Sequence, residues 1–362
     1  MQRARRSARN ALMRLQNLRR PAAAILLYHR VEAPLADPWN MAVSPAHFAE
    51  HMAVLRAWGR TETLSAATDR LTRTRAKGCV VAVTFDDGYG DNLVNALPVL
   101  ERESIPATLY AVSGALGDPL AFWWDILIKA LLETSQLPEH LKIDLGETSA
   151  SWRLGADAVY DTDALTRTAS WDADNEEPQD GRQRLLLEVW SFLAGLPRAQ
   201  RREAVAQLAD WAGIGTVSGK GDLGSPLTAD ELSRLAASPL IDVGGHTESH
   251  CDLSRTPDSG ALEEIVRDRN TLREITGQPV DHFGHPYGRR GPNTRAHLAS
   301  AGYATATSSV FGVATPGDDC LWLPRIQVPD IGGDEFERFI GSVTGLPRKG
   351  RHWPEPPSKA SS

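Results

Sequence analysis

Cysteine is scarce in this chain of 362 residues, and long hydrophobic runs are absent. The three cysteines lie far apart and form no Cys-x-x-Cys pair, which excludes a disulfide scaffold and a cysteine zinc cage. No run of 18 apolar residues occurs, so the sequence predicts no transmembrane helix. The short apolar stretch 22–28 ends in His29 and Arg30, a pattern that favours a buried strand over a signal peptide. We therefore expect a cytoplasmic protein with a packed core.

Acidic residues are missing from the first 20 positions, although acids outnumber bases in the chain as a whole. Residues 1–20 contain seven arginines and carry a charge of +7. Because the net charge of the whole chain is −7, the remaining residues carry −14. An acidic body argues against nucleic acid as a partner, because binding to phosphates depends on clustered Lys and Arg. Within 4–19, Ala and Leu share one helical face. This pattern is typical of a basic helix in peripheral contact with an anionic membrane, but also of a helix packed on the protein or a targeting segment.

Seven short segments rich in apolar and β-branched residues alternate with helical patterns. Such alternation predicts parallel β-α units, with functional residues where the strands end. The predicted strands are 23–28, 79–85, 107–112, 241–244, 281–285, 303–307 and 323–326. The predicted helices are 45–58, 91–103, 229–237, 260–275, 293–301 and 334–343.

The gap between the third and fourth predicted strands is far longer than a crossover requires. Within it, 133–180 has 12 acids against three bases, whereas 183–211 has a strong helical pattern. We therefore predict one barrel over 21–345, interrupted at 115–228 by an insertion that is part helical lid and part mobile acidic loop. The proline-rich tail 346–362 is predicted to be disordered.

Two polar motifs follow predicted strands. The first, Thr-Phe-Asp-Asp-Gly, places Asp86 and Asp87 side by side at a strand end, where a cation would relieve their repulsion. The second, His-Thr-Glu-Ser-His, places His246 and His250 on one face of a helical turn. A capping turn or a solvated surface would explain either motif alone. Both together favour a shared metal site.

Two imidazoles and one carboxylate leave coordination positions open, as in catalytic zinc sites. A water in the open position becomes a nucleophile at neutral pH, and the second aspartate is then available as general base. A two-histidine, one-carboxylate iron oxygenase is a competing class, but it leaves the second aspartate without a role.

These motifs, followed by Phe-Gly-His-Pro-Tyr-Gly at 283–288, resemble the polysaccharide deacetylases of carbohydrate esterase family 4, which have the NodB-homology fold. The resemblance implies an α/β fold, a distorted (β/α)7 barrel, that hydrolyses the acetamide of an N-acetylated sugar. It implies that Asp87, His246 and His250 hold a divalent metal, usually Zn²⁺, and that Asp86 is the base. A backbone N–H beside Tyr287 would stabilise the oxyanion together with the metal.

Two family features are missing. The family's Phe-Arg-Pro-Pro-Tyr segment has Gly284 in place of the arginine that tunes the base, and the C-terminal Leu-x-His that supplies the general acid is absent. Tyr28-His29 resembles the first strand of the biofilm poly-N-acetylglucosamine deacetylases, so we predict His29 as general acid, with a hydrogen-bonded core histidine as the alternative. Arg325 is predicted to pair with Asp86, or else to close the barrel as a structural ion pair.

Two further side chains are candidates for substrate contact. His285 is an unusual residue at its position in the family's segment and would either contact substrate or pack. Trp124, beside Trp123, is suited to stack on a sugar ring or to fill a helix core.

The sequence thus predicts a metal-dependent N-deacetylase of an amino-sugar glycan, or of its lipid-linked or oligosaccharide precursor. Alternatives on the same fold are another C–N hydrolase, acting on a cyclic amide or formamide, and an inactive carbohydrate-binding relative. The sugar, its linkage and the oligomeric state are left open.

Overall fold

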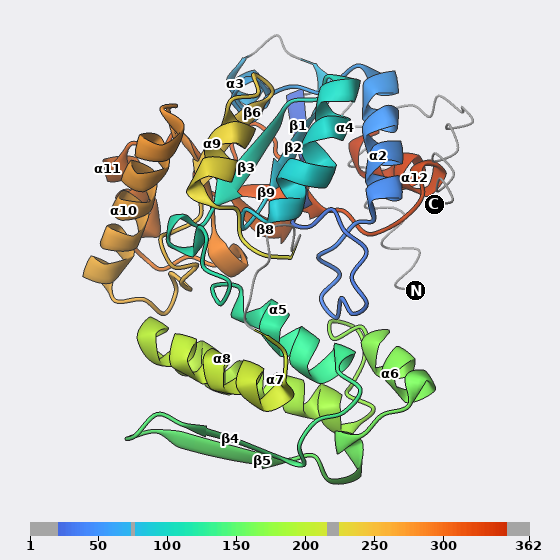
Figure 1. The fold of residues 1–362 in the computed structure, drawn as a ribbon. Coiled ribbons are helices and arrows are strands. Elements are labelled where there is room, and N and C mark those ends of the chain that lie inside the picture. Colours follow the sequence, from blue (N-terminus) through green and yellow to red (C-terminus); the bar gives the residue numbers. More distant parts are fainter. Residues whose placement is uncertain (1–20, 74–76, 216–223, 346–362) are drawn as a thin grey trace, which may run out of the picture. The chain divides into compact units, whose positions relative to one another are not determined.

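A computed structural model describes residues 21–73, 77–215 and 224–345 (Figure 1). The chain forms two compact units. The first contains the described residues up to Glu32, residues Val43–Leu116 and those from Leu227 onward, and the second contains Ala33–Ala42 and Gly117–Pro226. The segments 1–20 and 346–362 lie outside the described residues, so the predictions about them stay predictions. Within the described ranges no helix has the length and apolar character needed to cross a membrane.

The first unit is a closed barrel of seven parallel strands, which confirms the predicted fold class. Around the barrel the strands follow the order β1-β2-β3-β6-β7-β8-β9. The barrel is distorted, because the short strand β7 pairs with β6 only through Phe283 and Gly245. The strands are β1 Pro21–Tyr28, β2 Gly78–Phe85, β3 Ala107–Ala111, β6 Ile241–Gly245, β7 His282–Gly284, β8 Thr305–Phe311 and β9 Leu323–Gln327.

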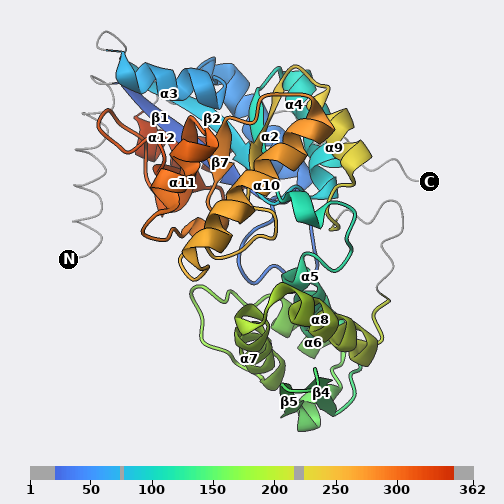
Figure 2. The same ribbon diagram turned by 90° about the vertical axis from the view of Figure 1, so that its left-hand side faces the viewer.

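Helices flank the barrel strands, and all six predicted ones are present (Figures 1 and 2). The first of them begins after Ser44, whose hydroxyl caps the helix by accepting from the N–H of His47, and ends at Gly59 with a left-handed φ of 62°. Among the helices of the first unit, α3 (Leu64–Thr72) was not predicted. The predicted helices are α2 Pro45–Trp58, α4 Leu97–Glu103 after one π-helical turn at Asn92–Ala96, α9 Ala229–Ala236, α10 Asp258–Thr276, α11 Thr294–Ala301 and α12 Gly333–Thr344.

Alternation along the strands separates an outer layer from the barrel interior. In β1, Leu26 and Tyr28 pack with Phe48 of α2 in the outer core, whereas Ile25 belongs to the inner cluster. In β2, Val80 and Ala82 belong to that inner cluster. Asp86 continues their alternation, so the strand directs its carboxylate toward the barrel axis.

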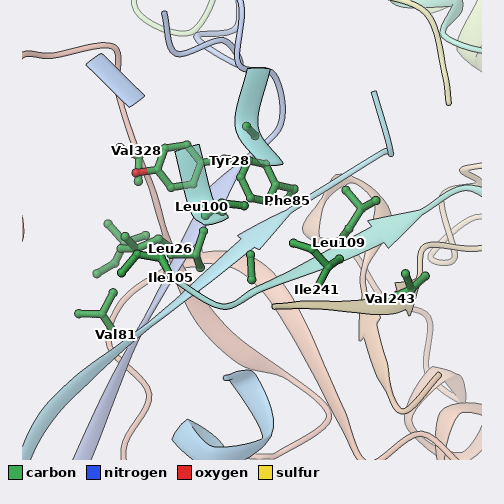
Figure 3. Packing of buried hydrophobic residues seen from close by; sticks show 14 of the residues in the cluster. Leu26, Tyr28, Val81, Phe85, Leu100, Ile105, Leu109, Ile241, Val243 and Val328 are labelled. Atoms are coloured by element: carbon green, nitrogen blue, oxygen red, sulfur yellow. The ribbon is translucent and has the colours of Figure 1, made fainter. Parts of the chain in front are cut away.

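The register of β1 against β2 determines which residues meet at the top of the barrel. Tyr28 is paired with Phe85, and their rings stack with centroids 5.6 Å apart (Figure 3). Both strands end at this pair. The residues that follow, His29 and Asp86, therefore leave the sheet side by side.

The second unit is largely helical but includes a hairpin. The prediction of a mobile acidic loop over 133–180 was wrong, because this segment forms the two antiparallel strands and one helix. Each strand is short, and in the first only Leu141 and Ile143 are buried, so the apolar alternation was too brief to detect among the charges. The elements are α5 Trp123–Ile128, β4 His140–Asp144, β5 Ser149–Arg153, α6 Thr162–Ala169, α7 Gly181–Gly195 and α8 Arg198–Ala212.

Residues 33–42 also belong to the second unit, although the sequence analysis placed them in the barrel. The N–H of Ala36 donates to the Glu133 carboxylate over 3.2 Å, and Pro38 accepts from the N–H of Ala173 over 2.8 Å. The rings of Trp39 and Trp190 lie 4.4 Å apart. These contacts join segments more than 90 residues apart in sequence, which local patterns do not reveal.

The buried His51 of α2 makes the barrel sensitive to acid. Its Nε2–H donates to the carbonyl of Ile331 over 2.6 Å, which leaves Nδ1 to accept from the Tyr28 hydroxyl over 3.2 Å. Burial lowers the pKa of His51 to about 4, against about 6.5 in an unfolded chain. The stability that depends on neutral His51 is complete above the unfolded value and is lost as pH falls toward the folded one.

We expect the variant His51→Gln, which keeps both hydrogen bonds without a titrating group, to lose less stability in acid than the parent. Between pH 7 and pH 5 the parent should lose about 2 kcal/mol more, at 1.36 kcal/mol per pKa unit. Urea unfolding at several pH values measures the difference. Parallel pH dependences in the two proteins would contradict the prediction.

Candidate functional site

The candidate site lies where the barrel strands end. His29 follows β1, Asp86 and Asp87 follow β2, and His246 follows β6. Because all seven strands are parallel, their carboxyl ends meet on one face of the barrel, the face that carries active sites in related architectures.

Asp87, His246 and His250 form a compact cluster, as the sequence analysis predicted. The Oδ1 atom of Asp87 lies 3.4 Å from Nε2 of His246 and 3.3 Å from Nε2 of His250. Their ligand atoms all lie within 4.8 Å of one another, the sole such group found among the described residues. The side chains of Asp87 and His246 are 2% exposed, and that of His250 is 11% exposed.

The cluster fits a tetrahedral metal ion. Two ligand atoms bound at about 2.1 Å and separated by the tetrahedral angle lie about 3.4 Å apart. The two nitrogen-to-oxygen distances match this spacing. The residues present could therefore hold a metal ion.

Hydrogen bonds set the orientation of His246. Its Nδ1–H donates to the carbonyl of Gly284 over 2.8 Å, so the lone pair is on Nε2, the atom that faces Asp87. Its backbone N–H donates to Oδ2 of Asp268, whose Oδ1 accepts from the N–H of Ser113. Asp268 on α10 thus fixes the ends of β3 and β6 relative to each other.

Arg325 pairs with Asp86, which was one of the two alternatives predicted from the sequence. Its Nη1 and Nη2 donate to the two carboxylate oxygens over 2.6 Å each, and its Nε donates to the carbonyl of Ser308 over 2.8 Å. A bidentate contact of this kind fixes the plane of the carboxylate. Both side chains are almost completely buried.

The pKa values of both aspartates lie below their usual range. Burial is the largest single influence and raises them, but polar and charged neighbours outweigh it. For Asp86 the neighbours are chiefly Arg325 and His246, and for Asp87 they are the imidazoles of His246 and His250. Asp86 is therefore ionised and able to accept a proton.

His29 lies beside Asp86. Its Nε2 is 3.9 Å from Oδ2 of Asp86, and its side chain is 15% exposed. The partial exposure distinguishes it from His51 and His285, which are fully buried. Its role as general acid stays a prediction.

Left-handed backbone conformations concentrate around the cluster. Four residues with a side chain have positive φ here: Asp87 (73°), Thr247 (64°), His250 (53°) and Tyr287 (56°). Such conformations cost energy outside glycine and persist where the surrounding structure enforces them, often at functional sites. Two of the four are the predicted metal ligands Asp87 and His250.

A sequence model of the family described as polysaccharide deacetylase matches residues 73–139 and 200–306. The matched segments contain Asp86 and all three residues of the cluster, and the interruption falls within the second unit. The chain belongs to the polysaccharide deacetylase family.

One relative is YxkH of Bacillus subtilis strain 168, which is named as a polysaccharide deacetylase. It is 33% identical over 96 residues, which are 26% of this chain and 33% of that protein. The match thus spans a third of the relative's length.

Two solved structures share the fold. PplD of Streptococcus pyogenes, a deacetylase solved with acetate, aligns with a TM-score of 0.53 at 15% identity over 89% of this chain and 98% of that one. IcaB of Ammonifex degensii aligns with a TM-score of 0.52 at 19% identity, covering 91% and 99%. At these identities the likeness establishes the fold.

The missing family arginine has a structural explanation. A Cβ atom at Gly284 would lie 2.8 Å from Nδ1 of His246 and 2.9 Å from the ring of Tyr110, so the position has no space for a side chain. The guanidinium comes instead from β9, where Arg325 also lies 5.6 Å from the Tyr110 ring centroid. In this chain the guanidinium that pairs with Asp86 therefore comes from a different strand than the one that carries Gly284.

His285 packs in the structure. It is 1% exposed, its Nε2–H donates to the carbonyl of Leu321 over 3.1 Å, and its ring lies edge-on to Trp322. Burial lowers its pKa to about 3. These contacts favour the packing alternative over substrate contact.

Tyr287 and Trp124 differ in exposure. Tyr287 is 38% exposed, and its ring lies edge-on to His250 with centroids 4.6 Å apart, so it borders the cluster. Trp124 belongs to the second unit, is 3% exposed and packs against Phe122 and Trp123. This packing favours the helix-core alternative for Trp124.

Sequence reasoning missed Asp268. The residue occupies the buried stripe of α10 together with Ala261, Ile265 and Leu272. An acid at an apolar position of an amphipathic helix was the available signal, since a buried carboxylate requires partners.

Proposed function

We propose that this family member is a metal-dependent hydrolase that removes the N-acetyl group from an amino sugar of a glycan, or of its lipid-linked or oligosaccharide precursor. The observation that supports this most strongly is the arrangement around Asp86. Arg325 orients the carboxylate, His29 lies 3.9 Å away, and the adjacent Asp87 belongs to the histidine cluster. Amide hydrolysis uses a Lewis acid, a base and a proton donor. Asp87 would help to hold a metal ion as the Lewis acid, Asp86 would be the base, and His29 would be the proton donor.

Asp87, His246 and His250 would hold the metal, with zinc as the expected ion. When bound, it would polarise the acetamide carbonyl and lower the pKa of a water molecule. Three protein ligands leave room for both.

Asp86 would take the proton from the attacking water. The two hydrogen bonds from Arg325 keep its carboxylate in one orientation and ionised, as a base must be before it reacts. The oxygen of the water bonds to the acetyl carbon as the C–N bond breaks.

His29 would deliver a proton to the departing amine nitrogen, because an amine anion is too basic to leave. The products are acetate and a free amino sugar. Since Tyr287 has a left-handed conformation next to the cluster, the backbone N–H beside it is proposed to donate to the developing oxyanion.

The test is acetate release by the full-length protein from N-acetylglucosamine oligomers in the presence of zinc. Acetate and free amine should be released in equal amounts. Their release should stop after chelation and resume when zinc is added. No acetate, with consumption of a cyclic amide or formamide, would indicate another C–N hydrolase. Sugar binding without turnover would indicate an inactive relative.

Two histidines of similar exposure form a matched control. His250 is 11% exposed and belongs to the cluster, whereas His297 is 12% exposed and pairs with Asp258 elsewhere. We expect His250→Ala to lose both bound zinc and acetate release, and His297→Ala to keep both. Equal zinc content in the two variants would contradict the assignment of His250 as a ligand.

A further inference from the structure

The loop that carries His29 is no longer paired with β2, and its backbone contact to the chain before α2 is one hydrogen bond, from the N–H of Val43 to the carbonyl of Arg30 over 3.0 Å. The register pairs of β1 with β2 end at Tyr28 and Phe85, and the N–H of Asp86 donates to the carbonyl of Tyr28 over 3.0 Å. Beyond this point His29, Arg30 and Val31 continue without strand pairing to β2. A proton donor on such a loop needs other contacts to keep its distance from the base.

Three side chains from one short segment bind the backbone of this loop. Asn92 donates to the carbonyl of His29 over 3.0 Å, and Asn95 donates to the carbonyl of Val31 over 2.8 Å. Oδ1 of Asp91 accepts from the N–H of Val31 over 2.9 Å. We call Asp91, Asn92 and Asn95 the loop clamp.

The clamp is itself rigidly connected. The second amide hydrogen of Asn92 bonds Oδ1 of Asp91 over 2.8 Å, and Oδ2 of Asp91 lies 3.5 Å from Nε of Arg30. Asp91 and Asn92 are buried, a costly placement for polar side chains unless it satisfies other polar groups. Here the groups satisfied are backbone atoms of His29 and Val31, directly after the His29 side chain in the chain.

The clamp follows the two aspartates in the chain. Only three residues separate Asp87 from Asp91, and the segment continues as the π-helical turn Asn92–Ala96. Turns of this kind are rare and are frequent at functional sites. One short stretch of chain therefore carries the base, a metal ligand and the residues that hold the acid loop.

We propose that Asn92 and Asn95, supported by Asp91, are positioning residues that set the distance between the acid His29 and the base Asp86. This inference rests on the proposed function. The clamp touches no reacting atom and acts through the backbone of residues 29–31. Misplacing a catalytic group by about 1 Å can lower a rate about 100-fold. Side chains that hold the backbone of residues 29–31 can therefore affect the rate strongly without touching the substrate.

A double-mutant cycle tests the proposal. Asn95→Ala, at a half-buried position, and Asn92→Ala should each lower kcat about 10-fold to 100-fold with little change in KM or zinc content. In a His29→Ala background the same changes should cost less than about twofold, because the group they position is gone. Equal losses in both backgrounds would overturn the proposal and indicate a general structural role.

Asn293→Ala provides a matched control. It also removes an amide donor from the first unit, since Asn293 donates to Asp258 over 2.9 Å at an exposed position. We expect it to keep full activity. Asn95→Gln, which retains the donor on a longer side chain, should recover part of the activity lost in Asn95→Ala.

A second measurement separates failure of this inference from failure of the proposed function. In ¹³C-histidine-labelled protein, the His29 ring signal, assigned with His29→Ala, should move or split in Asn92→Ala and Asn95→Ala, while the signal of the exposed His47 stays in place. This readout needs no substrate, so it decides the inference even if no acetate is released. An unchanged His29 signal in both variants would overturn the clamp.

Discussion

Asp86→Asn is expected to lower kcat/KM about a thousandfold while the protein keeps its zinc. The change removes the only proposed proton acceptor, and general-base contributions are about 10²-fold to 10⁴-fold. The cluster of Asp87, His246 and His250 is unaltered by the change. Acetate release and zinc content, measured on the same preparation, check the two halves of the prediction. Retained activity would remove Asp86 from the mechanism.

Stability has to be measured alongside activity, because Asp86→Asn leaves the guanidinium of Arg325 buried without its carboxylate. Removing one partner of a buried ion pair costs about 3–5 kcal/mol. We expect a similar loss in Arg325→Met, where the carboxylate is left alone. The double variant should recover much of the stability, since neither charge then remains, but none of the activity. Full additivity of the two losses would contradict the pairing.

His29→Ala is expected to lower kcat about 100-fold or more on an N-acetyl sugar, again with zinc retained. The amine leaving group requires a proton and the ring of His29 is the donor we propose. An aryl acetate ester, whose leaving group departs without protonation, should be hydrolysed by the variant nearly as fast as by the parent. This comparison separates the loss of an acid from general damage to the site.

The matched control for His29→Ala is His47→Ala. His47 is also a histidine of the first unit, but its partner is Asp330 at an exposed position on α2. His47→Ala should leave the rate of hydrolysis unchanged for both the N-acetyl sugar and the aryl ester. If His29→Ala slowed the ester and the amide equally, the alternative of a structural histidine would be preferred.

The strands of the barrel were predictable because their signal is local. Each is a short apolar segment bounded by turn residues or helical patterns, and parallel strands buried on both faces give such continuous runs. The hairpin of the second unit lacked this signal. His140–Asp144 buries only alternate residues and was hidden in a strongly acidic stretch.

The cluster of Asp87, His246 and His250 was predictable for a different reason. Paired aspartates and two histidines four residues apart each form a recognisable pattern after a strand, and all strand ends meet on one face. The partners of these residues were less visible. Arg325 was one of two alternatives, and nothing about Asn92 or Asn95 in isolation points to the loop after β1.

The sequence by itself determined the barrel, the family resemblance and the identity of the four motif residues, because these depend on local composition and on spacing along the chain. Only the tertiary structure decided the contacts between strands distant in sequence. The register of Tyr28 against Phe85 brings His29 to Asp86, and the closure of β9 onto β1 brings Arg325 to the same carboxylate. Register and closure depend on how entire strands pack, and no single segment of the sequence contains that information.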